Sequence, residues 1–164
     1  MGDADGFDEF YAACRPRLVR ALTVACGGDV EAAADATDEA LVRALERWKR
    51  VRAMPSAEAW VFAVGRNHLR RRFRRRSTER RLLQAHRVLD AEASSAGVAE
   101  AMELWAAVAE LPTRDREVVA YRYVLGLTEA EVAGALGVAT GTVSAALSRA
   151  RTRLRSQLAE EVAR

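Results

Sequence analysis

Several residue types that define common protein classes are scarce in this chain of 164 residues. Only two cysteines occur, Cys14 and Cys26, and neither belongs to a CxxC pair or has a histidine pair nearby, so we expect no disulfide framework and no metal site. A redox role for the two thiols stays open. With three prolines, 6% aromatic residues and 50% hydrophobic residues, the composition is typical of an alanine- and leucine-rich, all-α protein.

Long apolar runs are also missing from the sequence. No segment approaches the roughly 18–20 apolar residues that a membrane span needs. The acidic, polar N-terminus does not have the pattern of a signal peptide. We therefore expect a cytoplasmic protein without membrane insertion.

Recognisable catalytic motifs are missing as well. The sequence has no phosphate-binding glycine loop, no HExxH motif and no serine elbow, and the acids Asp35, Asp38 and Glu39 have no histidine or cysteine partner. On pattern alone, these acids indicate a solvated helix face. The sequence thus predicts a binding protein that is not an enzyme and needs no cofactor.

Arginine, by contrast, is abundant, because Lys49 is the only lysine among 26 basic residues. The arginines gather in a helix that the pattern predicts for residues 57–76, after the capping residue Ser56, and its second half reads RNHLRRRFRRR. They lie all round that helix, and like charges four residues apart cost stability, so a neutralising polyanion explains them better than folding does. Nucleic acid is the first hypothesis, and an acidic protein partner is the alternative.

The segment 127–155, LTEAEVAGALGVATGTVSAALSRARTRLR, has the pattern of two helices joined by a tight turn. Thr128 and Glu131 have the spacing of a capping box, and Gly137 stands where a helix commonly ends in the left-handed region. This pattern predicts a DNA-binding helix-turn-helix, with an ordinary helical hairpin as the alternative. The outer stripe of its second helix would consist of Thr142, Ser144, Ala145, Ser148 and Arg149.

The remaining pattern divides the chain into two parts. A helix predicted over 30–48 would include Leu45 on its inward face. Segment 77–99 starts charged and ends rich in alanine and serine, which is typical of a linker without its own core. We therefore predict an all-α fold of two small helical domains, residues 1–76 and 100–164, joined by a flexible linker.

Three short motifs stand in the helix-turn-helix: Leu136-Gly137-Val138, Gly141-Thr142-Val143 and Leu147-Ser148-Arg149-Ala150-Arg151. With them the segment resembles region 4, the promoter-binding domain of bacterial RNA polymerase sigma factors of the extracytoplasmic-function (ECF) group, in an actinobacterial-like form. In the first half, GGDVEAAADATDEALVRALERW resembles the helix of region 2 that docks on the polymerase clamp. PSAEAWVFAVGRNHLRRRFRRR resembles the helix that melts and holds the −10 element.

The resemblance implies an alternative sigma factor that binds core RNA polymerase and directs promoter-specific transcription initiation at −10 and −35 elements. Its partners would be the clamp helices of the largest polymerase subunit, the flap of the second-largest subunit, and promoter DNA. Many relatives also have an anti-sigma factor. The residues implied in polymerase binding are Asp35, Asp38, Glu39 and Arg43.

The same resemblance implies two sets of DNA-binding residues. In region 2, the loop 49–56 would receive a flipped base, and arginines of the following helix would hold phosphates without reading sequence. The residues implied for the −10 element are Arg52, Met54, Trp60, Asn67, Arg70, Arg71, Arg74 and Arg75. Those implied for the −35 element are Arg122, Thr140, Thr142, Ser144, Ala145, Ser148 and Arg149.

One departure from the family pattern concerns the −35 element. Ser144, Ala145 and Ala146 stand where family members usually carry basic or long polar residues. Alanine cannot make the bidentate contact to guanine, which is worth about 1–3 kcal/mol. We therefore predict a weak or unusual −35 preference.

Two other functions fit parts of the pattern. A free-standing helix-turn-helix regulator would bind duplex DNA tightly without being a polymerase subunit. An interaction protein whose basic helix docks on an acidic partner would show little salt-dependent affinity for DNA. Association with core RNA polymerase distinguishes the sigma factor from both.

Overall fold

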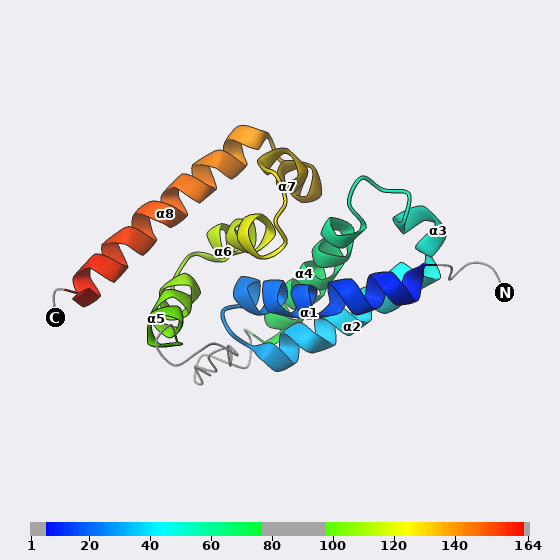
Figure 1. The fold of residues 1–164 in the computed structure, drawn as a ribbon, viewed down its shortest axis with the longest axis horizontal. Helices are drawn as coiled ribbons and strands as arrows, with labels where there is room; N and C mark the ends of the chain where they lie inside the picture. The colour runs from blue at the N-terminus through cyan, green and yellow to red at the C-terminus, as the bar shows by residue number, and fades with distance from the viewer. Residues whose placement is uncertain (1–5, 77–97, 163–164) are drawn as a thin grey trace.

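The structure is a computed structural model that describes residues 6–76 and 98–162. Over these residues the regular elements are all helical, which confirms the predicted all-α fold. Residues 77–97, most of the predicted linker, lie outside the described part. In chain order the elements are α1 (Phe7–Cys26), α2 (Val30–Glu46), α3 (Trp48–Val51), α4 (Ala57–Arg76), α5 (Val98–Ala109), α6 (Thr113–Val119), the π-helical turn η1 (Ala120–Val124), α7 (Glu129–Leu136) and α8 (Thr140–Val162) (Figure 1).

Helices α1 to α4 form an N-terminal module, in which α1, α2 and α4 pack closely. Helix α1 ends where Gly27 adopts a φ of 81°, and Asp29 then caps α2 by accepting a hydrogen bond from the Ala32 backbone N–H at 2.9 Å. Small side chains on the buried face of α2 let its neighbours approach. They are Ala32, Ala33, Ala36, Ala40 and Ala44.

Helices α5 to α8 form a C-terminal module that contains the predicted helix-turn-helix. The capping box is confirmed, since the Thr128 side chain accepts from the Glu131 N–H and the Glu131 carboxylate accepts from the Thr128 N–H. Gly137 ends α7 at a φ of 66°, also as predicted. Helix α8 then leaves at 109° to α7 and buries Val143 and Leu147 against the module.

The N-terminal and C-terminal modules pack against each other, and α5 begins at Val98, just before the predicted start of the second domain. Helix α1 contacts α5, α6 and η1, while α4 contacts α7. At the centre of this contact the rings of Phe62 and Tyr121 meet edge-on with their centroids 4.3 Å apart. Arg17 also donates to the Leu125 carbonyl at 2.7 Å. The hydrophobic core therefore continues from one module into the other.

None of the helices in the described part of the chain is, by itself, long and apolar enough to cross a membrane. Helices α7 and α8 reach that length and composition only when they are counted together across their bend.

The closest helix packing generates a stability prediction. A Cβ atom at Gly65 of α4 would lie 2.6 Å from Leu22 Cδ1 and 3.2 Å from the Ala36 carbonyl oxygen. Gly65→Ala should therefore lower the free energy of unfolding by about 1–3 kcal/mol, measured by urea denaturation. The matched control is Gly134→Ala in α7, where a Cβ meets nothing within 4 Å. That variant should raise stability by about 0.5–1 kcal/mol, and an equal loss in both variants would contradict the packing described.

Candidate nucleic-acid interface

Helix α4 changes character along its length. It starts at the predicted cap, since Ser56 Oγ accepts from the Ala59 N–H at 3.1 Å. Its first half then buries Val61 and Phe62 in the core. Its second half carries the arginine run, buries Leu69 in the core, and forms ion pairs with α2 and α6. This arrangement concentrates positive charge at one end of the N-terminal module.

Ion pairs within the described part of the chain neutralise some of these arginines. Arg72 Nη1 lies 2.7 Å from Asp35 Oδ2 on α2. Arg70 donates from Nε and Nη2 to the two carboxylate oxygens of Glu117 on α6, at 2.9 and 2.8 Å. Arg66 Nη1 lies 3.6 Å from the same carboxylate. The chain itself therefore supplies part of the negative charge that the arginine run requires.

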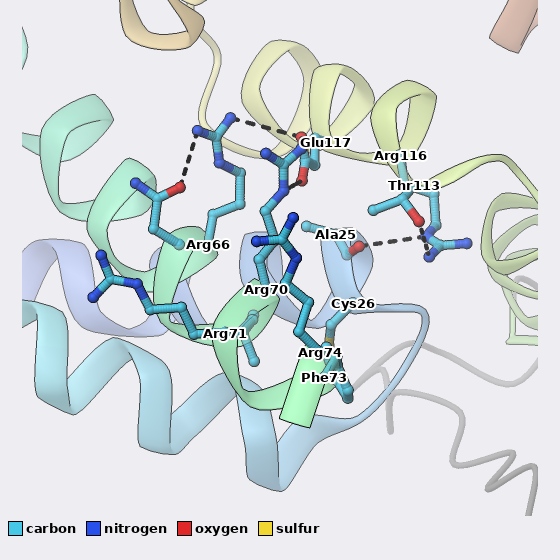
Figure 2. Close-up of a pocket in the computed structure, with 12 residues that line it drawn as sticks. Ala25, Cys26, Arg66, Arg70, Arg71, Phe73, Arg74, Thr113, Arg116 and Glu117 are labelled. Atoms are coloured by element: carbon cyan, nitrogen blue, oxygen red, sulfur yellow. Dashed lines mark hydrogen bonds and ion pairs between the residues drawn. The ribbon is translucent and has the colours of Figure 1, made fainter. Parts of the chain in front are cut away.

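A basic cleft of about 770 Å³ lies between α4 and α6 (Figure 2). Its apolar floor includes Cys26 and Phe73, and five arginines line it beside Glu117. This brings together four residues predicted for the −10 element, whereas the side chain of Arg75 lies outside the described part. The four residues of that predicted set are Asn67, Arg70, Arg71 and Arg74. The other two arginines that line the cleft are Arg66 and Arg116.

Arg116 contributes to this cleft from the C-terminal module. Its guanidinium directs donors to carbonyl oxygens, with Nη1 2.8 Å from the Ala109 oxygen and Nε 3.4 Å from the Ala25 oxygen. Burial lowers the pKa of Arg116 from its usual value, because a low-dielectric environment disfavours the charged form. The cleft therefore combines cationic side chains with partial shielding from water, which favours an anion.

The other predicted −10 residues lie nearer the start of α4. Met54 and Trp60 line a mostly apolar hollow of about 610 Å³, together with residues of α7 such as Ala130 and Gly134. Arg52 is exposed at the end of α3. The predicted −10 set is thus divided between the basic cleft and this hollow.

The predicted −35 residues lie in the C-terminal module, mostly on the outer face of α8. Arg149 Nη2 lies 3.2 Å from Asp115 Oδ1, and Ser144 Oγ donates to the carboxylate of Glu129. Arg122, half-buried, donates to the Leu127 carbonyl at 3.2 Å. The exposed members are Thr140, Thr142, Ser144, Ala145, Ser148 and Arg149.

Comparison with known proteins assigns both modules. A family model of sigma-70 region 2 matches residues 10–79, and a model of sigma-70 region 4 matches residues 101–154. The chain belongs to the sigma-70 family. The predicted ECF group is confirmed by a relative from Mycobacterium tuberculosis, the ECF RNA polymerase sigma factor SigC, and a probable RNA polymerase sigma-C factor from Mycobacterium bovis is equally similar.

Each of these relatives is 32% identical to the chain over 124 residues, which make up 73% of this chain and 66% of the relative. Two solved structures share the fold at 22% identity. The sigma factor RpoE, in complex with the anti-sigma factor NepR from Bartonella quintana, gives a TM-score of 0.79 over 93% of this chain and 96% of that one. CnrH, in complex with the cytosolic domain of CnrY, gives a TM-score of 0.63 over 97% of this chain and 91% of that one.

In region 2, helix α2 places the predicted polymerase-binding residues on its outer face. Asp38 accepts two hydrogen bonds from Arg15, at 2.8 and 3.0 Å, and Glu39 pairs with Arg43 at 2.7 Å. These four predicted residues, including Asp35, are partly exposed, and all have partners within the chain.

Two apolar residues on the same face were not predicted as functional. Val42 is 55% exposed and Leu45 is 45% exposed, although Leu45 was expected to face the core. That expectation was wrong because the alanines fill the buried side of α2, so Leu45 faces solvent beside Val42. An exposed pair of large apolar residues next to polar ones is typical of a protein interface.

The two cysteines lie twelve residues apart in the single helix α1. A rise of 1.5 Å per residue places them about 18 Å apart, too far for a disulfide, which needs Cα atoms within about 7 Å. Burial raises the pKa of both thiols to about 11 by disfavouring the thiolate. Neither thiol therefore has the properties of a redox sensor.

These values predict slow thiol chemistry in the folded chain. At pH 8 both Cys14 and Cys26 should react with a thiol reagent much more slowly than in denaturant, because the protonated thiol is not the nucleophile. The reaction rate should rise only as the pH approaches about 11. A stopped-flow titration with Ellman's reagent measures this, and a rate that levels off above pH 8.5 would show that the thiols are exposed and reactive.

Proposed function

We propose that this chain is an alternative sigma factor, which binds core RNA polymerase and directs it to promoters with −10 and −35 elements. The observation that carries the proposal is the combination, in one chain, of an arginine-lined cleft in region 2 and an exposed polar helix in the helix-turn-helix of region 4. In this scheme polymerase supplies the catalysis, and the chain acts in the cytoplasm as a non-enzymatic subunit.

Region 2 would hold the opened −10 element. Guanidinium groups such as those of Arg70 and Arg71 match phosphate oxygens in geometry and charge, so they suit the backbone of a separated strand. The apolar hollow beside Met54 and Trp60 offers an aromatic surface on which an unstacked base can pack. Asn67, which lines the cleft, would approach the neighbouring bases.

Region 4 would bind duplex DNA upstream through the outer face of α8. The side chains there are short, and Arg149, the one long cationic residue predicted to read bases, is shared with Asp115. Contacts from Thr142, Ser144 and Ser148 to phosphates or thymine methyl groups would then dominate. This supports a weak −35 preference that relies in part on DNA shape.

Val42 and Leu45 form an exposed apolar patch on α2. This patch would contact the clamp helices of the largest polymerase subunit, together with the surrounding polar residues Asp35, Asp38, Glu39 and Arg43. Apolar side chains framed by polar ones have the composition of a hot spot with its rim. Region 4 would bind the flap of the second-largest subunit. Because RpoE is bound to the anti-sigma factor NepR in the structure above, we also propose an anti-sigma factor for this chain.

Transcription with purified core RNA polymerase on a library of genomic promoters tests the function. The sigma factor predicts discrete start sites that depend on the chain. Tight binding to a palindromic duplex without polymerase would instead favour the free-standing regulator. If the chain gave no start sites and showed no salt-dependent DNA binding, the remaining function would be that of an interaction protein with an acidic partner.

A variant of the patch tests the polymerase contact. The double substitution Val42→Ser, Leu45→Ser should weaken binding to core polymerase by about tenfold or more, because it removes two apolar anchors from the interface. The matched control is Val30→Ser, at the other end of α2, where the side chain is 36% exposed. Surface plasmon resonance on immobilised core enzyme measures both, and equal affinities would remove the patch from the proposal.

A further inference from the structure

Glu117 is a buried carboxylate at the boundary between regions 2 and 4. Its side chain is 2% exposed, and it faces Arg66 and Arg70 of α4 across the cleft (Figure 2). Arg70 meets it with both Nε and Nη2, the parallel arrangement that gives a guanidinium–carboxylate pair its strength. An acid of region 4 therefore occupies the arginines that region 2 would present to DNA.

The geometry makes carboxylate and phosphate competitors at this point. The same edge of a guanidinium, with two parallel N–H groups, accepts either anion. Arg70 uses that edge on Glu117, so it cannot hold a phosphate in the same way until Glu117 leaves. Because Glu117 belongs to α6, a movement of α6 away from α4 would free both arginines at once.

The balance of energies suits an exchange between the two anions. Bringing two charges out of water costs about as much as their attraction returns, but removing only one of them leaves an uncompensated charge. Among the described residues, Arg66 Nε and the hydroxyl of Tyr121 are also buried without a hydrogen-bond partner. The contact between α4 and α6 therefore leaves some polar groups unpaired. A phosphate bound by Arg66 and Arg70 would compensate these arginines for the lost charge of Glu117.

Further contacts close the same boundary and would open with it. The Phe62 and Tyr121 rings pack across it, and Arg17 donates to the Leu125 carbonyl. Arg116 reaches Ala25 from α6 at 3.4 Å. Apart from Glu117, these contacts are apolar or involve carbonyl oxygens, so none of them replaces the carboxylate as a counterion for α4.

We propose that Arg66 and Arg70 form one phosphate site for the opened DNA strand, and that in the free chain Glu117 fills this site and closes region 4 over region 2. The inference rests on the proposed function only in taking the second half of α4 as the DNA-facing surface. Arg66, which is 9% exposed in the closed chain, becomes a DNA contact only when Glu117 leaves. Strand binding and separation of the modules are then one coupled equilibrium.

The substitution Glu117→Gln tests the competition in the full chain. It keeps the shape of the side chain but removes the charge that holds Arg66 and Arg70. Fluorescence anisotropy with a short, mixed-sequence single-stranded DNA should show about tenfold tighter binding than for the wild-type chain, as expected when a competent fraction of about one tenth becomes dominant. The slope of log affinity against log salt should steepen by about 0.7 for each phosphate gained.

The matched control is Asp115→Asn on the same helix. Asp115 is also buried, at 3% exposure, but it pairs with Arg149 and Arg153 inside region 4. This variant changes the net charge by the same amount without touching the boundary with α4. Its affinity for single-stranded DNA should rise much less than that of Glu117→Gln. Equal gains in the two variants would overturn the proposal, because net charge alone would then explain the tighter binding.

Three further variants keep the test independent of folding. In the Glu117→Gln background, Arg66→Gln and Arg70→Gln should each remove part of the gained affinity and lower the salt slope by about 0.7. Glu117→Asp, which keeps the charge but shortens the reach, should give a smaller gain than Glu117→Gln. An unchanged slope in both arginine variants would overturn the shared phosphate site.

Transcription with core polymerase separates this inference from the proposed function. If the wild-type chain directs discrete start sites while Glu117→Gln leaves single-stranded DNA binding unchanged, the closing role of Glu117 is wrong and the sigma factor function stands. If the wild-type chain directs no start sites, the proposed function fails whatever Glu117 does. Tighter strand binding together with retained start sites in Glu117→Gln supports both.

Discussion

Electrostatic repulsion along the second half of α4 is the constraint on which the rest of the structure depends. The arginine run places like charges on successive turns of one helix, which costs about 0.2–0.5 kcal/mol for each such pair unless counterions are near. Within the described residues, Asp35 from α2 and Glu117 from α6 act as counterions. The first fixes α4 within its own module, while the second joins the two modules. How α4 is neutralised therefore decides how region 4 sits on region 2.

Local rules predict the elements of this fold well, because each depends on a few neighbouring residues. The capping box of Thr128 and Glu131, the turn at Gly137 and the cap at Ser56 all follow from spacing alone. The family resemblance likewise rests on short motifs. For the same reason the helix-turn-helix could be placed before any tertiary contact was known.

The sequence could not predict the contacts that join distant parts of the chain. Arg70 and Glu117 stand 47 positions apart, and nothing in the spacing of either identifies its partner. Leu45 was predicted to face the core because it is apolar and follows the helical spacing of buried residues. The helices packed against α2 do not cover all of its apolar positions, and Leu45 is left exposed. Arg149 was assigned to the −35 element by the family resemblance, and its ion pair with Asp115 could not be predicted because nothing in the sequence places Asp115 beside α8. Whether these residues also contact DNA and polymerase stays a prediction.

The account's central claim is that one set of arginines serves either Glu117 or DNA, so that the modules separate when a strand binds. Energy transfer between dyes at the exposed positions Glu46 of α2 and Ser156 of α8 measures this most directly. The account predicts high transfer in the free chain, and lower transfer with single-stranded DNA or in the Glu117→Gln variant. The same high transfer under all three conditions, with the strand bound, would contradict it.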